Sequence, residues 1–436
     1  MGEEKKAFNT FSAAMLGIGS MVGVGIFIVI GLAGSIAGNL VWASFVVGGI
    51  IAILSGYSLA KLAVRYPSRG GIIEYLVQEY GENSFSGGLS VLFYFAQLIT
   101  LAAVAKSFGE YGARLFGYHS TIMIDAFAVG VILFFTIINL LGATFVAKSE
   151  NIIVAIKLSA LIIFTIAAFT TIKPEYLSLK DAPPAINILF AVALTFFAYQ
   201  GYSVITNTVE DMENPKQTVI KAMFLAIGIV TVLYVSVSIA VLGNLPLSEV
   251  IKAKDYALAE AAKPIMGELG FKIMAVVALI SATTAINATL YAATEISYTL
   301  AKKGELPKIY EYNVWHSYEG LIISTILIIP MILFLNLTEI TTVAALSVLI
   351  IQALTHFGHL KVIKKTGANK TLIISAFVLM VVIVLISIYY YMQKDHKVVW
   401  YLIAAFVVSF IVEILLKVFT NRTVKKQIKS LTEELF

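Results

Sequence analysis

Glycines cluster in an apolar stretch near the start of the chain, GIGSMVGVGIF over residues 17–27. Gly17, Gly19, Gly23 and Gly25 weaken a helix there, because each glycine costs roughly 1 kcal/mol relative to alanine. Where a helix breaks, backbone N–H and C=O groups lose their partners. Free N–H groups at the start of a half-helix attract a carboxylate, and free C=O groups attract an ammonium. A zwitterionic α-amino acid presents both charges, so a break here predicts a site for one.

A second weak point has the sequence FFAYQGYSVITN over residues 196–207, where Gln200 and Gly201 interrupt an apolar run. Unwound backbone inside a membrane is tolerated only where it is buried in protein or lines a cavity. Two alternatives exist for the first stretch. Glycines in membrane spans also allow close helix packing. A dinucleotide fingerprint is strongly disfavoured, because the spacing is G-x-G-x-x-x-G, no strand precedes it and it lies in a hydrophobic span.

Ionisable side chains inside apolar segments are costly and therefore suggest function. Lys106 lies about two turns from one end of its segment, so we expect its stem to snorkel outward and its role to be structural. Lys157, in VAIKLSALIIF, could snorkel or act in function. His356 and His359 have the spacing i, i+3, but a metal site needs further ligands. We therefore expect this pair at the membrane interface and predict no metal site.

Four acidic residues lie in or near apolar segments. Asp125, Glu110 and Glu413 are near segment ends, and we expect them to be solvated. Glu295 is farther inside, and we expect it to pair with a lysine at the inner end of its segment. The chain has no cysteine, so thiolate metal sites and cysteine nucleophiles are excluded. No zinc motif, nucleophile with its base, or repeated filter segment is evident, which disfavours a membrane enzyme and a channel. No cofactor and no nucleic-acid partner is expected.

The composition requires a lipid environment. Hydrophobic residues make up 59% of the 436 residues and charged residues 13%, whereas soluble domains carry about 25% charged residues. A membrane helix needs roughly 20 mostly apolar residues, and twelve segments satisfy this. They are 11–37, 40–64, 85–113, 121–141, 150–172, 185–209, 218–243, 269–300, 320–336, 340–360, 371–392 and 398–418. The sequence thus predicts an all-α polytopic membrane protein.

Twelve spans put both termini on one side of the membrane. With that arrangement, twenty of the 31 lysines and arginines fall on the terminal side and nine on the other. Positive charge marks the cytoplasm, so we expect residues 1–10 and the tail 419–436 to be cytoplasmic. The loop 244–268 on the outer side has apolar residues at helical spacing. It could form a helical lid or a helix resting on the outer surface.

The two weak points fall in the first and sixth spans. That relation is expected if spans 1–5 and 6–10 are inverted repeats, and interrupted helices in corresponding positions indicate a transporter's substrate site. The predicted organisation is a ten-helix core over 11–360, with repeats 11–172 and 185–360. Two further helices follow over 371–418.

Four stretches together resemble one family. They are GIGSMVGVGIF, PSRGGIIEYLVQEYG, FFAYQGYSVITNTVEDMENPKQ and NATLYAATEISYTLAKKGELPK, in this order along the chain. The chain resembles the amino acid–polyamine–organocation superfamily, and within it the archaeal proton-coupled amino acid transporters. The resemblance implies a LeuT-like fold of two inverted five-helix repeats with two peripheral helices. It also implies alternating access without a cofactor.

The resemblance also carries expectations for single residues. The residues expected to bind the substrate backbone are Ser20, Met21, Val22, Gly23, Val24, Gly25, Phe197, Ala198, Tyr199 and Gly201. Phe197 would be an aromatic gate over the substrate. Lys157 would occupy the space that sodium fills in sodium-coupled relatives, with Gly19 and either Thr283 or Thr284 as contacts. Many relatives have an acid at the position of Ser203, so a proton relay through an acid there is in doubt.

The expected function is secondary active transport of amino acids across the plasma membrane, coupled to protons and independent of sodium. The two break regions contain no acid or base, which favours small to medium neutral amino acids, since an unpaired buried charge is costly. An amino acid or polyamine exchanger and a membrane receptor without transport are the alternatives. The sequence does not determine the oligomeric state.

Overall fold

Helices account for nearly all of the part of the chain that the computed structural model describes. The described residues are 8–23, 25–68, 70–141, 145–178, 180, 182–212, 214–304, 306–315 and 317–420. The α-helices are α1 (Thr10–Met21), α2 (Gly25–Ala37), α3 (Val41–Arg65), α4 (Ile72–Tyr80), α5 (Ser84–Leu115), α6 (Thr121–Leu140), α7 (Phe145–Phe169), α8 (Ile186–Tyr199), α9 (Pro215–Asn244), α10 (Leu247–Lys252), α11 (Ala257–Glu260), α12 (Lys263–Lys303), α13 (Glu319–Phe334), α14 (Leu337–Thr366), α15 (Lys370–Lys394) and α16 (His396–Thr420). The 3₁₀ helices and strands are η1 (Gly38–Leu40), η2 (Pro174–Leu177), η4 (Gln200–Asp211), η5 (Lys308–Glu311), β1 (Asn313–Val314) and β2 (Ser317–Tyr318).

Ten segments within the described residues are long and apolar enough to cross a membrane. Two of the twelve expected spans are not among these ten segments as spans of their own. The first, expected over 11–37, is divided into α1 and α2, and α2 is grouped with α3. The ninth, expected over 320–336, is the apolar helix α13, which has 16 residues. The chain is therefore an all-α polytopic membrane protein, and the count of twelve stays a prediction.

Several helix starts follow from local capping chemistry. The Asn83 side chain accepts from the backbone N–H of Ser86, and the Ser86 hydroxyl accepts from the N–H of Asn83. Asn336 and Glu339 form the same reciprocal box at the start of α14. Such boxes satisfy N–H groups that the first turn of a helix leaves without partners. Both helices therefore begin where the sequence places an asparagine three residues before a hydroxyl or carboxylate.

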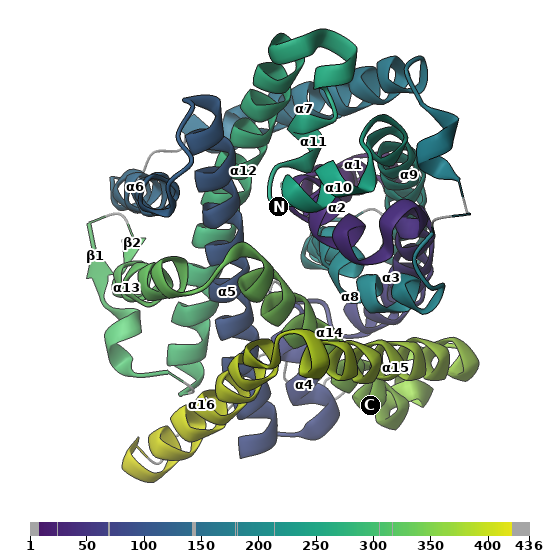
Figure 1. Cartoon of the computed structure of the whole chain (residues 1–436). Coiled ribbons are helices and arrows are strands. Elements are labelled where there is room, and N and C mark those ends of the chain that lie inside the picture. The colour runs from purple at the N-terminus through teal and green to yellow at the C-terminus, as the bar shows by residue number, and fades with distance from the viewer. Residues whose placement is uncertain are drawn as a thin grey trace.

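The helices form two packed groups around the centre of the molecule. In one group α3 packs against α8 and α9, α2 packs against α8, and α1 packs against α9 and η4. In the other, the long helix α5 packs against α6, α12, α13 and α14. Figure 1 shows α5 near the centre of the view, with α1, α2, α3 and α9 to its right and α16 toward the lower left. The first and sixth spans thus belong to the group that packs on α3 and α9.

Both weak points of the sequence are changes of helical structure, but of different kinds. In the first span, α1 ends at Met21 and α2 begins at Gly25. In the sixth, α8 passes without a gap into η4, a 3₁₀ helix of 12 residues. The expectation of unwound backbone at Gln200 and Gly201 is therefore corrected to a tighter helix. Runs of 3₁₀ helix beyond a few residues are uncommon, and inside a span they often mark a hinge.

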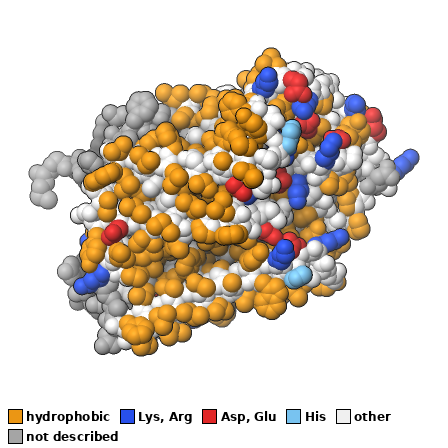
Figure 2. Space-filling view, turned by 60° about the vertical axis from the view of Figure 1, so that its left-hand side comes forward, with side chains coloured by type: hydrophobic (Ala, Val, Ile, Leu, Met, Phe, Trp, Pro, Cys, Tyr) orange, Lys and Arg blue, Asp and Glu red, His pale blue; other side chains and the backbone are white. Residues whose placement is uncertain are grey.

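The surface matches a membrane environment on the face shown in Figure 2. Hydrophobic side chains cover most of this face, and charged side chains gather mainly toward its right-hand edge.

We call the side of the molecule on which α1 begins the N-terminal side, and the other the opposite side. On the opposite side α10 and α11 pack on α2. Val250, Leu258 and Ala259 in this loop are fully buried, so it packs into the helices and does not merely rest on them.

Candidate functional site

The break of the first span and the α8–η4 junction of the sixth span meet backbone against backbone. A Cβ atom placed on Gly201 of η4 would lie 2.5 Å from the backbone nitrogen of Met21, at the end of α1. A Cβ atom on Gly25, the first residue of α2, would lie 3.1 Å from the Cα of Ala198 in α8. Side chains at positions 201 and 25 would force these backbones apart. Glycine is therefore needed at 201, and it allows the close approach at 25.

Gly23 differs from the other glycines of the first span. A Cβ on Gly17 would lie 2.5 Å from Ile205, and one on Gly19 would lie 2.8 Å from Val154. At Gly23 the nearest atoms are the Ser20 carbonyl oxygen at 3.5 Å and the Ala285 Cβ at 3.9 Å. Close packing, the alternative raised by the sequence, thus explains most of the cluster. Gly23 alone in this stretch leaves space toward α12.

Two side chains bind carbonyl groups at the end of α1. Lys157 of α7 is 3% exposed, and its Nζ donates to the Gly19 carbonyl at 2.7 Å. The Tyr234 hydroxyl of α9 lies 2.6 Å from the Met21 carbonyl oxygen and 3.1 Å from that of Ala198. The carbonyls of Gly19 and Met21 belong to the last turn of α1, where hydrogen-bond partners are missing and a cation is favoured by the helix dipole. A lysine and a tyrosine therefore tie the end of α1 to α7 and α9.

Sequence reasoning missed Tyr234. It is fully buried, and a buried tyrosine hydroxyl usually finds a hydrogen-bond partner. A lone tyrosine in the middle of the apolar seventh span is thus a weak signal for a polar contact inside the bundle. The partner, however, comes from backbone 213 residues earlier in the chain, and no local pattern identifies it.

The start of α2 provides the opposite polarity. Its first N–H groups have no partner within the helix, so this end favours an anion. Ser20, just before the break, is exposed, while Met21 and Val22 are buried. Val24, another expected contact, lies outside the described residues. The break thus places carbonyl groups, N–H groups and one accessible hydroxyl within a few residues.

Three of the four expected residues of the sixth span, Phe197, Ala198 and Tyr199, are buried, and Gly201 is half-buried. Phe197 is 6% exposed and Ala198 is 2% exposed. The Tyr199 hydroxyl donates to the Phe45 carbonyl at 2.9 Å, which directs this side chain toward α3. Only the backbone of Tyr199 is then available to the break.

The threonines expected near Lys157 bond within their own helix. The Thr283 hydroxyl donates to the Ile280 carbonyl at 2.8 Å, and the Thr284 hydroxyl donates to the Ser281 carbonyl at 2.9 Å. Thr283 also lines a groove with Phe108 and Phe134, between α5 and α6. Its side chain therefore lies on the side of α12 that faces α6.

Glu295 and Ser203 are the remaining residues raised by the sequence. Glu295 is half-buried in α12, and the described residues give it no ion pair, unlike the pairing we expected. The Ser203 hydroxyl donates to the Gln200 carbonyl at 3.2 Å, within the first turn of η4. Neither side chain has a described contact with Lys157.

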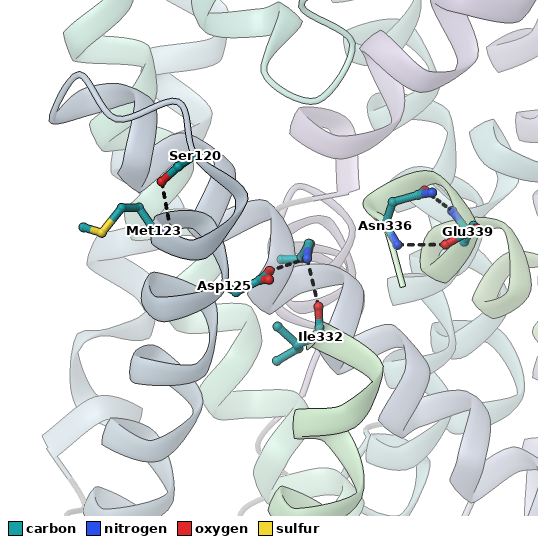
Figure 3. A network of polar contacts seen from close by, with 7 residues as sticks. Ser120, Met123, Asp125, Ile332, Asn336 and Glu339 are labelled. Carbon is teal, nitrogen blue, oxygen red and sulfur yellow. Dashed lines mark hydrogen bonds and ion pairs between the residues drawn. The ribbon is translucent and has the colours of Figure 1, made fainter. Parts of the chain in front are cut away.

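Lys106 does not snorkel. Its Nζ forms an ion pair with Asp125 of α6 and donates to the Ile332 carbonyl of α13 at 2.8 Å. Figure 3 shows Asp125 and Ile332 pointing toward the same amino group, with the Asn336–Glu339 box nearby. Lys106 is 5% exposed. The prediction that Lys106 extends outward to solvent was wrong. The Asp125 carboxylate and the Ile332 carbonyl hydrogen-bond its ammonium inside the protein, so it does not need water as a partner.

Two of the acids that we expected to be solvated are buried. Glu110 is 8% exposed beside Arg114, whose nitrogen lies 3.8 Å away. Glu413 of α16 is 2% exposed and packs on Gly87 of α5. The expectation failed because the sequence locates a residue along a helix but does not show which neighbour covers it. Asp125 is also shielded, by its ion pair with Lys106.

The histidine pair is not interfacial. His356 and His359 are fully buried, and each contacts a serine hydroxyl of α3 at 2.8 Å. The serines are Ser55 and Ser58, which share the spacing i, i+3 with the histidines. Residues at i and i+3 lie on the same face of a helix, so the serine face of α3 can contact the histidine face of α14 at both positions. No cluster of three metal-ligating side chains occurs among the described residues.

The opposite side of the molecule has a polar cavity beneath the α10–α11 loop. It has a volume of about 470 Å³ and is lined by charged residues that include Lys106, Glu110, Lys254 and Asp255. Burial raises the pKa of Asp255, and the cations Lys254 and Arg114 oppose that effect. The Lys254 backbone packs directly on Gly31 of α2. This side of the first span is therefore covered.

Comparison with known proteins adds independent information. A family profile described as amino acid permease matches residues 8–414. An uncharacterized protein of Methanocaldococcus jannaschii is 36% identical over 96% of this chain and 97% of its own length. An inner membrane transport protein of Escherichia coli is 31% identical over 96% of this chain and 98% of its own. A serine/threonine exchanger of Bacillus subtilis is 26% identical over 70% of each chain.

Proposed function

Because this chain belongs to the amino acid permease family of the amino acid–polyamine–organocation superfamily, we propose that it is a proton-coupled secondary transporter of neutral amino acids. The observation that carries the proposal is that the break of the first span crosses the α8–η4 junction of the sixth. There the end of α1, the start of α2 and the α8–η4 junction come together. These are the groups that an amino acid's two charges require.

The substrate would bind at the break with its carboxylate toward the first N–H groups of α2. Gly23 leaves the space that this carboxylate needs, since its nearest neighbours are at 3.5 and 3.9 Å. The ammonium would bind carbonyl groups of the first span and of the α8–η4 junction. Phe197 would cover the bound molecule. The described parts of both breaks carry no ionised side chain, which favours a neutral substrate because a charged side chain would be buried without a partner.

Lys157 would be the residue that links protons to transport. As an ammonium it makes a charge-assisted hydrogen bond to the end of α1, and such bonds are about twice as strong as neutral ones. As a neutral amine it would hold α1 less tightly. A proton gradient could then bias the position of α1, because protonated and neutral forms would favour different conformations. No sodium would be required if the ammonium occupies the place of that ion.

Alternating access would move the N-terminal half of the first span relative to α5 and α12. The present arrangement has α2 covered by the α10–α11 loop, while Ser20 is exposed. We take this arrangement as open toward the N-terminal side. The distribution of lysines and arginines predicts that this side faces the cytoplasm and that both termini lie on it. The membrane would be the plasma membrane. An impermeant reagent that labels a single cysteine at position 3 in intact cells would contradict this orientation.

The decisive experiment is transport in proteoliposomes made with purified protein. A panel of amino acids is first screened for thermal stabilisation, because a ligand that binds only the folded state raises its melting temperature. The best ligands are then tested for accumulation in sodium-free buffer with an inward proton gradient. We expect neutral amino acids to accumulate. Accumulation of arginine or lysine alone, or an absolute need for sodium, would contradict the proposal.

Exchange is the second candidate, and the resemblance to a serine/threonine exchanger favours it. An exchanger would show uptake of labelled substrate only when the liposomes contain unlabelled amino acid. A coupled carrier would accumulate substrate into empty liposomes. A receptor without transport would bind ligand and show neither activity.

A further inference from the structure

A buried hydrogen-bond network joins the sixth span to two helices of the bundle. We call it the histidine network, and it consists of Ser55 and Ser58 of α3, Tyr202 of η4, and Gln352, His356 and His359 of α14. Ser55, Ser58, Tyr202, His356 and His359 are fully buried, and Gln352 is 1% exposed. Nothing in the transport scheme above uses it, yet it holds two groups that can bind protons near neutral pH.

The network has two parts, one nearer the N-terminal side and one beside the break, and no hydrogen bond between the two is described. His359 Nε2 contacts the hydroxyl of Thr366, the last residue of α14, at 2.8 Å, and its Nδ1 contacts Ser58. One turn deeper, His356 Nε2 contacts Ser55, and the Ser55 hydroxyl is 2.6 Å from the Tyr202 hydroxyl. Tyr202 directly follows Gly201, the residue that packs on the end of α1.

Counting hydrogen atoms assigns the protonation of His356. The Ser55 hydroxyl has one hydrogen, which it donates to Gln352 Oε1 at 3.0 Å. The Tyr202 hydroxyl can donate its single hydrogen to Gln352 Oε1 at 2.7 Å or to Ser55 Oγ at 2.6 Å, and neither choice gives Ser55 a second hydrogen. The contact between Ser55 and His356 must then be donated by the Nε2–H of the histidine. Neutral His356 therefore has its lone pair on Nδ1. That atom is buried and has no hydrogen-bond partner among the described residues.

The surroundings disfavour a charge on His356 while the network is closed. His359 is adjacent on α14, and Lys61 of α3 is close enough to repel a charge on His359. On α4, which also packs on α14, Glu79 and Tyr80 face Lys361. From η4, the Tyr202 hydroxyl is the ionisable group that takes part in the network. No carboxylate is bonded to His356 among the described residues, so an added proton at Nδ1 needs water to stabilise it.

We propose that His356 is a second proton-binding site, which takes up its proton at Nδ1 when η4 moves away from α3 and α14 and releases it when Tyr202 docks again. The inference rests on the proposed function in one respect, because it takes from the transport cycle the movement of η4. Docking closes the network around a neutral imidazole, whereas undocking admits water that can solvate an imidazolium. Proton binding and η4 position are then linked, because the two conformations differ in proton affinity.

Histidine NMR tests the proposal without any transport measurement. The protein is labelled with ¹⁵N-histidine in nanodiscs, and the His356 ring signals are assigned with the His356→Gln variant. We expect the Nε2–H tautomer at high pH and protonation at Nδ1 as the pH falls. Tyr202→Phe removes the hydroxyl but keeps the ring, so it should raise the pH at which His356 protonates. His396→Gln, which changes an exposed histidine, should leave that pH unchanged.

Two results would overturn the proposal. One is an Nδ1–H tautomer of neutral His356. The other is a His356 titration that Tyr202→Phe does not move. Proton uptake on substrate binding, measured with a dye in weak buffer, gives the functional arm. His356→Gln should reduce it and Lys157→Ala should leave the His356 part intact. If no amino acid binds to the wild type, the proposed function fails, while the NMR result still decides the role of His356.

Discussion

Two lysines inside membrane helices have opposite structural settings. Lys106 pairs with the carboxylate of Asp125 and bonds a carbonyl of α13. Lys157 is equally buried, and its described bond goes to the carbonyl of Gly19 at the end of α1. Lys106 thus joins three continuous helices. Lys157 joins a continuous helix to a broken one.

The difference teaches how one residue type can serve stability or movement. An ion pair between continuous helices leaves an uncompensated buried charge if either partner is removed, so it resists rearrangement. A bond to the free end of a half-helix can break without unfolding either helix, because that carbonyl belongs to the unpaired last turn. We therefore expect changes at Lys106 to affect folding and changes at Lys157 to affect coupling.

The largest expected effect is the loss of coupling in Lys157→Ala. In sodium-free proteoliposomes, accumulation driven by an inward proton gradient should fall to the level seen without a gradient. The protein should remain folded and still bind ligand in the thermal-stabilisation assay. Lys106→Met is the matched control, and its folded fraction should keep the response to the gradient. If Lys157→Ala accumulates substrate normally, the comparison between the lysines collapses and Glu295 becomes the next residue to test.

Blocking the break should be nearly as severe. Gly23→Leu fills the space beside Ser20 and Ala285, so we expect a folded protein that shows no thermal stabilisation by substrate. Gly25→Leu should also abolish binding, with an additional loss of stability because Ala198 is only 3.1 Å from the added Cβ. Gly228→Leu in α9 is the control, since nothing lies within 4 Å of a Cβ there. Normal transport by a folded Gly23→Leu protein would remove the break from the binding site.

A smaller effect is expected on stability when the Lys106 pair is broken. Lys106→Ala leaves Asp125 shielded without its cation, and removal of one partner of a buried pair costs about 3–5 kcal/mol. We expect a lower melting temperature in detergent for Lys106→Ala and for Asp125→Ala. Lys106→Met combined with Asp125→Leu should recover most of the loss, because no charge remains. A double variant as unstable as the single ones would show that the charges are not the cause.

The smallest expected effect concerns Tyr234, which holds the same half-helix end as Lys157. Tyr234→Phe removes a hydroxyl that contacts the carbonyls of Met21 and Ala198, a loss of about 1 kcal/mol. We expect roughly fivefold weaker substrate binding, measured by titration of the thermal shift. The exposed Tyr389 provides the control, and Tyr389→Phe should leave the affinity unchanged. An unchanged affinity in Tyr234→Phe would mean that Lys157 alone positions the end of α1.

The sequence alone determined the helices, the break in the first span and the family of this protein. Apolar segments of sufficient length predicted the helices closely, as the expected span 40–64 and the observed α3 (Val41–Arg65) illustrate. The glycines at 23 and 25 located the break in the first span, because glycine weakens a helix regardless of its neighbours. The motifs were sufficient to predict the family, which the profile over residues 8–414 establishes.

Tertiary structure alone decided which side chains meet. It paired Lys106 with Asp125, buried the two histidines against α3, and placed Tyr234 on carbonyls from two other spans. It also made the sixth span a helix that changes from α to 3₁₀ without a gap, where the sequence suggested unwound backbone. Periodicity gives the position of a residue along its own helix and the face on which it lies. The partner on that face belongs to another helix, and helix packing, which local sequence does not encode, selects it.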